Sequence, residues 1–324
     1  MKSPNKPIGI FYEHHIWFKP LFDELQRRNI PFVRINAAQN QFNPQERDAP
    51  YSLIVNRMSS SAYLRGNVQG IFYATNYLNH IERLGVPIVN GTFAQEIEMS
   101  KARQLGVIAS LGLSFPKTRV INHISQLLSA AKSFRFPVII KPNVGSSGAG
   151  ILKFESAQKL QQAMDRHQIN LGVDHSTLVQ EYIAPKDGHI VRVETLNGKF
   201  LYAIKIYPAG DNFNLCPAEL NEIRTAVIDG NNSSNRIRVE SFVPSRQIID
   251  DVQRIAKAAR LDAGGVEYLV HPETNEVYYY DINVLSNFVA HAEDVIGFDP
   301  YEAFVDYLEQ RLQPIYDLEQ APIL

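Results

Sequence analysis

The sequence predicts an α/β protein with mixed sheets and more than one domain, and three observations lead to this prediction. Strand-like and helical segments alternate through the first ninety residues, as in an open α/β unit. A second mixed segment follows, and the rest of the chain is rich in strands. The chain has 324 residues, 45% of them hydrophobic, which exceeds the usual size of one domain and is enough to build two or three cores.

The N-terminal elements follow from apolar runs separated by polar or glycine-containing breaks. Residues 92–115 are predicted as one helix, which carries Lys101 and ends before Pro116. The expected strands before it are 8–11, 31–36, 52–57 and 86–91, and the expected helices are 17–29 and 62–85.

The same patterns predict the elements of the second and third segments. A hairpin is expected over 188–208, because Asn197-Gly198 is a strong type I′ turn signal. The polar stretch 227–239 is predicted as a loop. The other expected strands are 118–121, 136–141, 151–156, 177–183, 263–272 and 275–285, the last two antiparallel, and the other expected helices are 124–134, 157–167, 245–261 and 299–312.

Composition excludes several classes of protein. Lys and Arg number 32 against 34 Asp and Glu, so no basic excess is present to bind nucleic acid or an anionic membrane. The single cysteine, Cys216, forms no internal disulfide and is expected to be a small buried hydrophobe in a reducing compartment. No run approaches the roughly 20 apolar residues of a membrane span, and the N-terminus does not resemble a signal peptide. We therefore expect a cytoplasmic protein with no nucleic-acid or membrane partner.

The stretch KPNVGSSGAG at 141–150 is a candidate phosphate-binding loop. It is not a P-loop, because Lys141 precedes the glycines and a strand follows them. The dinucleotide-binding pattern is also absent, since Gly145, Gly148 and Gly150 have the reversed spacing. A hairpin remains, whose Gly/Ser tip is able to fold backbone N–H groups over an anion. On this stretch alone, an ordinary glycine-rich hairpin with a solvated lysine stays an alternative.

Two carboxylates lie on neighbouring predicted strands near the C-terminus. They are Glu267 and Asp281, and Asn283 lies two residues after Asp281 and hence on the same face. Three oxygen ligands at one place suit Mg²⁺, with Mn²⁺ as an alternative metal. A salt-bridged or exposed pair of carboxylates is the other interpretation.

Taken together, the motifs and their order along the chain resemble those of the ATP-grasp superfamily. Within it they are most similar to the RimK- and glutathione-synthetase-like ligases, and the resemblance spans about residues 95–310. The matching parts are Lys101, Lys141 with its glycine loop, Glu181 in LVQEYI, Arg192, Lys205, Glu267 and the DIN of 281–283. The resemblance implies an ATP-grasp fold: a small N-terminal α/β domain over 1–95 and two α+β subdomains, 96–185 and 186–324, that grip ATP.

The resemblance also implies residue roles. Lys101 and Lys141 would contact the phosphates of ATP, and Gly145, Ser146, Ser147 and Gly148 would close over them. Gln180, Glu181, Tyr182 and Ile183 would receive the adenine, and Asp187 or His189 would hold the ribose. Arg192 and Lys205 would be catalytic, and Glu267, Asp281 and Asn283 would bind the metal. Two departures are Asp281, where many relatives have Glu, and the absence of the RimK-like lid sequence from 207–220.

The activity implied is that of an ATP-dependent carboxylate–amine ligase that forms an amide through an acylphosphate and releases ADP and phosphate. Its substrates would be a small-molecule acid and amine, such as amino acids or a peptide, and a homodimer is common among such ligases. A nucleotide-binding regulatory protein and a phosphotransferase without an acyl acceptor are the alternatives. Candidates for substrate contact, each of which is otherwise a solvated surface residue, are Arg57, Arg224, Arg236, Arg238, Asn287 and His291. His14 and His15 are expected to serve a loop rather than a metal, because adjacent extended residues point to opposite faces.

Overall fold

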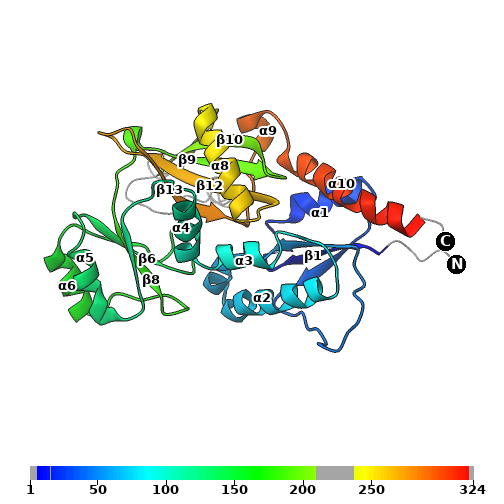
Figure 1. Cartoon of the computed structure of the whole chain (residues 1–324), viewed down its shortest axis with the longest axis horizontal. Coiled ribbons are helices and arrows are strands. Elements are labelled where there is room, and N and C mark those ends of the chain that lie inside the picture. The colour runs from blue at the N-terminus through cyan, green and yellow to red at the C-terminus, as the bar shows by residue number, and fades with distance from the viewer. Residues whose placement is uncertain (1–5, 15, 209–236, 321–324) are drawn as a thin grey trace, which may run out of the picture.

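The computed structural model describes residues 6–14, 16–208 and 237–320, and the side chains of α10 as far as residue 312 (Figure 1). Its strands form three sheets, one in each successive part of the chain. Cys216, Arg224, Arg236, His15 and most of the predicted loop 227–239 lie outside the described residues. The domain boundaries at residues 95 and 185 stay predictions.

The N-terminal sheet is parallel and has the strand order β2-β1-β3-β4. All five residues of β1 are buried, because helices cover both faces of the sheet. One face packs against α1 and α10, and the other packs against α2. The elements are β1 (Ile8–Tyr12), α1 (Lys19–Arg27), β2 (Phe32–Asn36), β3 (Leu53–Arg57), η1 (Ser60–Arg65), α2 (Val68–Arg83) and β4 (Ile88–Val89).

Two predicted long helices are each broken in the structure. The helix predicted over 62–85 is wrong as a single element, since Gly66 ends η1 in the left-handed region with φ 80° before α2 begins. The helix predicted over 92–115 is divided into α3 (Thr92–Glu98) and α4 (Lys101–Ser110). Ser100 caps α4 by accepting a hydrogen bond from the N–H of Arg103 at 3.2 Å. Lys101 therefore lies at the first turn of a helix rather than in its middle.

The second sheet is antiparallel, with the order β5-β8-β6-β7 and its own apolar cluster beneath α5 and α6. In Figure 1 these two helices lie at the end of the molecule opposite to α1 and α10. The predicted hairpin around 141–150 is confirmed as the β6–β7 pair. The elements are β5 (Thr118–Ile121), η2 (Ile124–Gln126), α5 (Leu127–Ala131), β6 (Val138–Pro142), β7 (Leu152–Phe154), α6 (Ala157–Asp165) and β8 (Thr177–Glu181).

The third sheet is antiparallel, with the order β11-β10-β9-β12-β13. The turn predicted at Asn197-Gly198 is confirmed, with φ 52° and 69°. Strand β11 was not predicted, and it begins at Arg238 inside the stretch 227–239. The elements are η3 (Lys186–Gly188), β9 (Ile190–Leu196), β10 (Lys199–Tyr207), β11 (Arg238–Phe242), α8 (Arg246–Ala258), β12 (Ala263–Val270), β13 (Val277–Asn283), α9 (Ala292–Ile296) and α10 (Pro300–Gln320).

The two faces of the third sheet have different roles. One face packs against α4 and α8 through residues such as Val191, Val193 and Val266. The alternating residues, such as Ile190 and Arg192, point to the other face, which looks toward the second sheet. The third sheet is therefore buried on one side and lines a cavity on the other.

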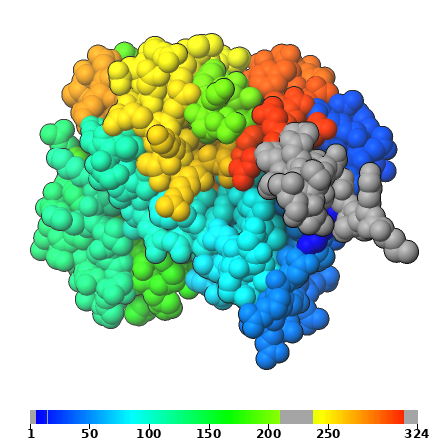
Figure 2. All heavy atoms as spheres, turned by 45° about the vertical axis from the view of Figure 1, so that its right-hand side comes forward, coloured from blue at the N-terminus to red at the C-terminus, as the bar shows by residue number. Residues whose placement is uncertain are grey.

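The C-terminal helix returns to the N-terminal part of the chain. Arg28, the residue after α1, donates to Glu309 at 2.8 Å and also contacts Asp306. The space-filling view places the blue N-terminal residues beside the red residues of α10 (Figure 2). Phe304 and Leu308 complete the apolar cluster under β1. Across residues 6–14, 16–208 and 237–320, no helix has both the length and the apolar character needed to cross a membrane.

Candidate functional site

A cavity of about 390 Å³ lies between the β6–β7 hairpin and the open face of the third sheet. Most of the predicted site residues line it. They come from distant segments of the sequence, since Lys101 and Asp281, for example, are 180 residues apart. The predicted residues that line the cavity are Lys101, Lys141, Gly145, Ser146, Ser147, Gly148, Gln180, Glu181, Tyr182, Ile183, Arg192, Glu267, Asp281 and Asn283.

Two buried lysines line the cavity. The ammonium of Lys101 donates to Asp281 Oδ1 at 2.6 Å. Burial alone would lower the pKa of Lys101, but the adjacent Asp281 carboxylate raises it above its usual value. Lys141 has no such direct partner in the described residues, and burial together with the charge of Lys101 lowers its pKa to about 8. An ammonium without a carboxylate partner, such as that of Lys141, suits a phosphate group.

The carboxylates oppose each other across β12 and β13, where Glu267 pairs in register with Asp281. Asn283 Nδ2 donates to Glu267 Oε1 at 3.2 Å, and its own amide oxygen stays an acceptor. Burial and the neighbouring Asp281 raise the pKa of Glu267. Burial opposes ionisation of Asp281 as well, but Lys101 and Lys141 lower its pKa. Two carboxylates and one amide oxygen are the hard donors that Mg²⁺ prefers, and the ammonium beside Asp281 marks a position that accepts a cation.

Tyr280 joins this cluster through a register shift that sequence reasoning missed. Glu267 pairs with Asp281 but Tyr268 pairs with Tyr279, so Tyr280 is an extra residue in β13. Both Tyr280 and Asp281 consequently line the cavity. The ammonium of Lys141 lies 5.4 Å from the centre of the Tyr280 ring. A single sequence carries no signal for such a bulge, because the run of tyrosines at 278–280 fits a regular strand equally well.

Arg192 is held by an acceptor at each of its three nitrogens. Nε donates to Glu194 at 2.6 Å, Nη1 to Glu267 at 3.4 Å and Nη2 to Ser286 Oγ at 3.2 Å. The ion pair with Glu194 is buried, with side-chain exposures of 8% for Arg192 and 2% for Glu194. The guanidinium is thus fixed in direction at the cavity wall.

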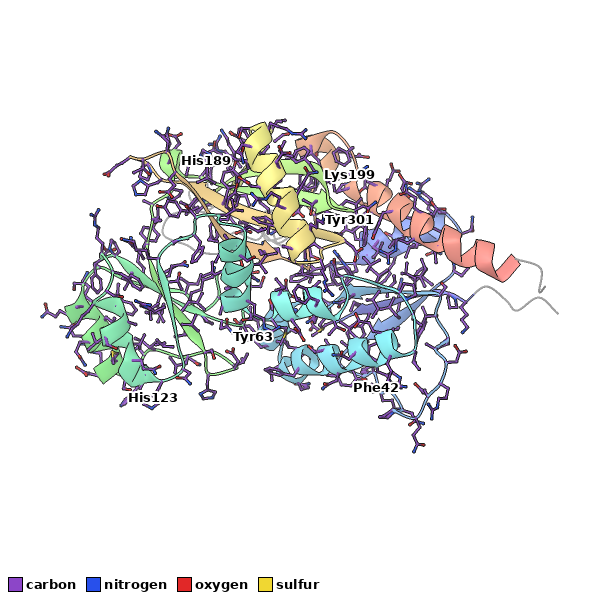
Figure 3. The ribbon with its side chains drawn as sticks, in the orientation of Figure 1. Phe42, Tyr63, His123, His189, Lys199 and Tyr301 are labelled. Carbon is purple, nitrogen blue, oxygen red and sulfur yellow. The ribbon has the colours of Figure 1, made fainter. Side chains whose placement is uncertain are left out.

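The glycine loop forms part of the cavity wall. Ser147, Gly148 and Gly150 have φ values of 54°, 68° and 75°, and such left-handed residues in a tight turn direct backbone N–H groups toward one side. Tyr63 from η1 approaches this loop, and a Cβ on Gly145 would lie 3.4 Å from its hydroxyl. Figure 3 shows Tyr63 where the N-terminal part meets the second sheet. The loop is therefore bordered by both.

Apolar side chains from several strands also line the cavity, and such a lining suits a flat ring. They are Ile139, Ile183, Ile190 and Leu269, which lie in or just after four different strands. Gln180 is fixed by its hydrogen bond to Thr118 Oγ1 at 2.8 Å. Lys153 and Glu155 also line the cavity and were not predicted, although strand alternation in 151–156 places both on one face.

Three predicted site residues do not line this cavity. Lys205 pairs with Val191 and so lies on the α8 face of the sheet, where its ammonium is 4.7 Å from the centre of the Phe242 ring. Asp187 is exposed in η3, and the His189 ring lies 5.1 Å from that of Tyr207, at the outer end of the sheet (Figure 3). The expectation that Lys205 is catalytic and that Asp187 or His189 contacts ribose is therefore not supported by their positions.

The candidate substrate contacts are also divided. A second cavity, of about 340 Å³, adjoins the main one, and Trp17 and Asn287 line both. His291 lines only the second cavity. Arg57 is 1% exposed and lines neither. Arg238 donates a hydrogen bond to Glu240, and its guanidinium stacks on the ring of Tyr207. His14 stacks on Trp17 with a centroid distance of 4.1 Å, which agrees with a loop role.

Comparison with known proteins identifies this arrangement. Residues 98–216 match the family described as the RimK-like ATP-grasp domain. The chain therefore has the ATP-grasp fold. Among solved structures, ATP-grasp ligase PsnB complexed with minimal precursor has a TM-score of 0.67 at 14% identity, covering 94% of this chain and 99% of that one. D-alanine–D-alanine ligase from Bacillus anthracis complexed with ATP has a TM-score of 0.66 at 15% identity, covering 98% and 100%. The predicted ATP-grasp fold is confirmed.

Curated relatives of this ATP-grasp protein are ligases. A probable alpha-L-glutamate ligase of Marinomonas sp. is 29% identical over 143 residues, which cover 44% of this chain and 46% of the relative. A D-alanine–D-alanine ligase of Citrifermentans bemidjiense is 29% identical over 150 residues, which cover 46% and 43%. The matches thus span about half the length of the curated relatives. The distant similarity is therefore to ATP-grasp carboxylate–amine ligases.

Proposed function

We propose that this chain is an ATP-dependent ligase that joins a carboxylic acid to an amine and releases ADP and phosphate. The observation that carries the proposal is the buried cluster in which Arg192, Glu267 and Asp281 meet Lys101 at one end of the cavity. Adenine recognition by a regulatory protein needs an apolar slot and a few backbone groups. It does not need an arginine oriented by two buried carboxylates beside the phosphate end.

The proposed reaction has two steps. A carboxylate oxygen of the acid attacks the γ-phosphorus of ATP, the bond from that phosphorus to the β,γ-bridging oxygen breaks, and ADP leaves. The amine nitrogen then attacks the acyl carbon of the acylphosphate, phosphate leaves with the electron pair of the C–O bond, and the nitrogen loses a proton. Phosphoryl transfer of this kind depends on positioning and charge neutralisation more than on covalent help from the protein.

The residues of the cavity supply both requirements. Lys101 and Lys141 would neutralise the phosphates, and the glycine loop would direct N–H groups at them. Arg192 would stabilise charge on the transferred phosphoryl group and on the tetrahedral oxyanion, because its direction is already fixed before reaction. Glu267, Asp281 and Asn283 would hold Mg²⁺, or Mn²⁺, which when bound neutralises phosphate charge. The apolar lining next to Gln180 would receive the adenine.

The acid and the amine would lie at the end of the cavity lined by Trp17 and Asn287. Both residues also line the second cavity, so a substrate longer than one amino acid has room to extend there. The curated relatives in the comparison are named as glutamate and D-alanine ligases, and one solved relative is complexed with a peptide precursor. Amino acids and short peptides are therefore the substrate classes to try first.

A coupled ADP-release screen tests the proposal. The intact protein is incubated with ATP, Mg²⁺ and pairs of amino acids or dipeptides, and mass spectrometry of the positive wells identifies the product. We expect ADP release that requires both members of a pair. ADP release with the acid alone would favour a phosphotransferase, and no release with any pair, despite nucleotide binding, would favour a regulatory protein.

A further inference from the structure

The turn after β13, residues 284–287, is held from the N-terminal part of the chain. Glu98 Oε2 accepts hydrogen bonds from the N–H groups of Val284 at 2.9 Å and Leu285 at 3.4 Å. Arg57 Nη2 donates to the backbone carbonyl of Ser286. Side chains from α3 and from the end of β3 therefore fix the backbone of a turn more than 180 residues away in sequence.

Arg57 is in an environment that stability alone does not favour. Its side chain is buried between the rings of Phe18 and Phe304, at 5.2 and 5.4 Å from its guanidinium carbon. Its Nε and Nη1 have no hydrogen-bond partner among the described residues. Burial lowers the pKa of Arg57, and the charge of Glu194 offsets this only in part. Because an apolar side chain of similar volume avoids the desolvation of a cation, a methionine at this position is expected to be tolerated.

The contact with Ser286 connects Arg57 to the cavity. The carbonyl of Ser286 accepts from Arg57, and its hydroxyl accepts from Arg192 Nη2 at 3.2 Å. Ser286 is fully buried, so neither contact is shared with solvent. Glu194 and Glu267, which also accept from Arg192, belong to the third sheet itself. The contact with Ser286 instead connects Arg192 to the N-terminal sheet through Arg57.

We propose that Arg57 is a positioning residue, which fixes the turn 284–287 and, through the Ser286 hydroxyl, sets the direction of the Arg192 guanidinium at the cavity wall. This inference rests on the proposed ligase function of Arg192. The N-terminal part of the chain then contributes to turnover without touching ATP. Since the direction of Arg192 matters for charge that develops during reaction, the effect falls on kcat more than on ATP binding.

The test compares Arg57→Met, Arg57→Lys, Ser286→Ala and the double variant Arg57→Met/Ser286→Ala with the intact protein. ADP release is measured with an acid–amine pair from the screen above, ADP affinity by calorimetry, and folding by thermal melting. Arg83→Met is the matched control, because Arg83 also donates to backbone carbonyls, those of Pro44 and Glu46, away from the turn.

We expect Arg57→Met to lower kcat roughly tenfold or more, with ADP affinity unchanged within about twofold and no loss of melting temperature. Ser286→Ala should show a similar loss, and the double variant should be no worse than Ser286→Ala by more than about twofold, because both changes break one chain of contacts. Arg57→Lys, which keeps one donor for the carbonyl of Ser286, should recover part of kcat.

Several outcomes overturn the inference. One is full kcat in Ser286→Ala, which keeps Arg57 and the backbone carbonyl that Arg57 contacts. This result counts even if Arg57→Met fails to fold. Additive losses in the double variant would show that Arg57 acts by a route other than the Ser286 hydroxyl. A wild-type protein that binds ADP but turns over no pair contradicts the proposed function instead, so the two failures are distinguishable.

Discussion

Lys141 gives the sharpest test of the phosphate site, because its protonation should change when nucleotide binds. Burial and the charge of Lys101 lower the pKa of Lys141 to about 8. Phosphate oxygens favour the charged ammonium, so nucleotide binding should raise this pKa again. At pH 8 about half of the Lys141 side chains are neutral, so binding should take up about half a proton per nucleotide, rising toward about one proton near pH 9.

Calorimetry with Mg²⁺ and ADP measures this uptake. ADP contains the phosphates that Lys141 is proposed to contact, and it does not react. The observed enthalpy is plotted against the ionisation enthalpy of several buffers at about pH 7, 8 and 9, and the slope of each plot gives the number of protons exchanged. We also expect the ADP affinity to fall above pH 8, by up to about tenfold per pH unit, because a lysine must first be protonated.

Two variants control for other titrating groups. Lys141→Arg keeps the cation but does not titrate in this range, so its slope should be near zero and its affinity independent of pH. Lys141→Met removes the cation and should bind ADP more weakly by about 1.5–3 kcal/mol. A zero slope in the unchanged protein at pH 8 and 9, or the same slope in Lys141→Arg, would refute the reasoning.

The same pKa has a consequence for stability. In the unfolded chain Lys141 titrates near the ordinary lysine pKa of 10.5, so between pH 8 and 10.5 the unfolded state binds more protons than the folded state at this group. The free energy of unfolding contributed by Lys141 therefore rises with pH across this window, and the cost of burying the ammonium is fully present below pH 8. Relative to Lys141→Met, the unchanged protein should become more stable as the pH rises from 8 toward 10.

Three further predictions follow from the site. Arg192→Met should reduce turnover about 10²–10³-fold with little change in nucleotide affinity, whereas Lys205→Met, on the other face of the sheet, should keep turnover within about threefold; steady-state ADP release compares them. Nucleotide should raise the melting temperature much more with Mg²⁺ than in EDTA, and equal shifts would contradict the metal assignment to Glu267, Asp281 and Asn283. Gly265→Ala should lower turnover, because the added Cβ would lie 2.8 Å from Glu194 Oε1 and 3.0 Å from Arg192 Nε. Gly106→Ala is the control, because a Cβ there has no atom within 4 Å, and equal turnover in the two variants would contradict the prediction.

Much of the fold was predictable because strand and helix patterns are local. The antiparallel pairing of 263–272 with 275–285 and the Asn197-Gly198 turn follow from short-range signals and are confirmed. The predicted helices failed where a local break decided the path. Gly66 and Ser100 each interrupt an apolar periodicity that is otherwise continuous. Gly66 ends η1 in the left-handed conformation, and Ser100 begins α4 with its side-chain cap.

The site was predictable to the extent that its motifs fall on known strand faces. Asp281 and Asn283 share a face by alternation, and Glu267 meets them because β12 and β13 are neighbours. Lys205 failed for the same geometric reason: it lies three residues after Tyr202 in β10 and one residue from Ile204 and Ile206, which point to the opposite face. A motif match in linear order does not fix which face of a strand a residue occupies.

Contacts across the whole chain were beyond sequence reasoning, and they change how the N-terminal part is understood. From the sequence Arg57 was a candidate for direct contact with substrate, and a solvated surface residue was the alternative. The structure instead encloses it and directs one nitrogen to the carbonyl of Ser286, 229 residues later. Such a contact depends on α10 covering the N-terminal sheet with Phe304 and on α3 holding Val284 through Glu98. In the proposed arrangement, the N-terminal part therefore sets the direction of Arg192 at the cavity wall through polar contacts with the turn 284–287.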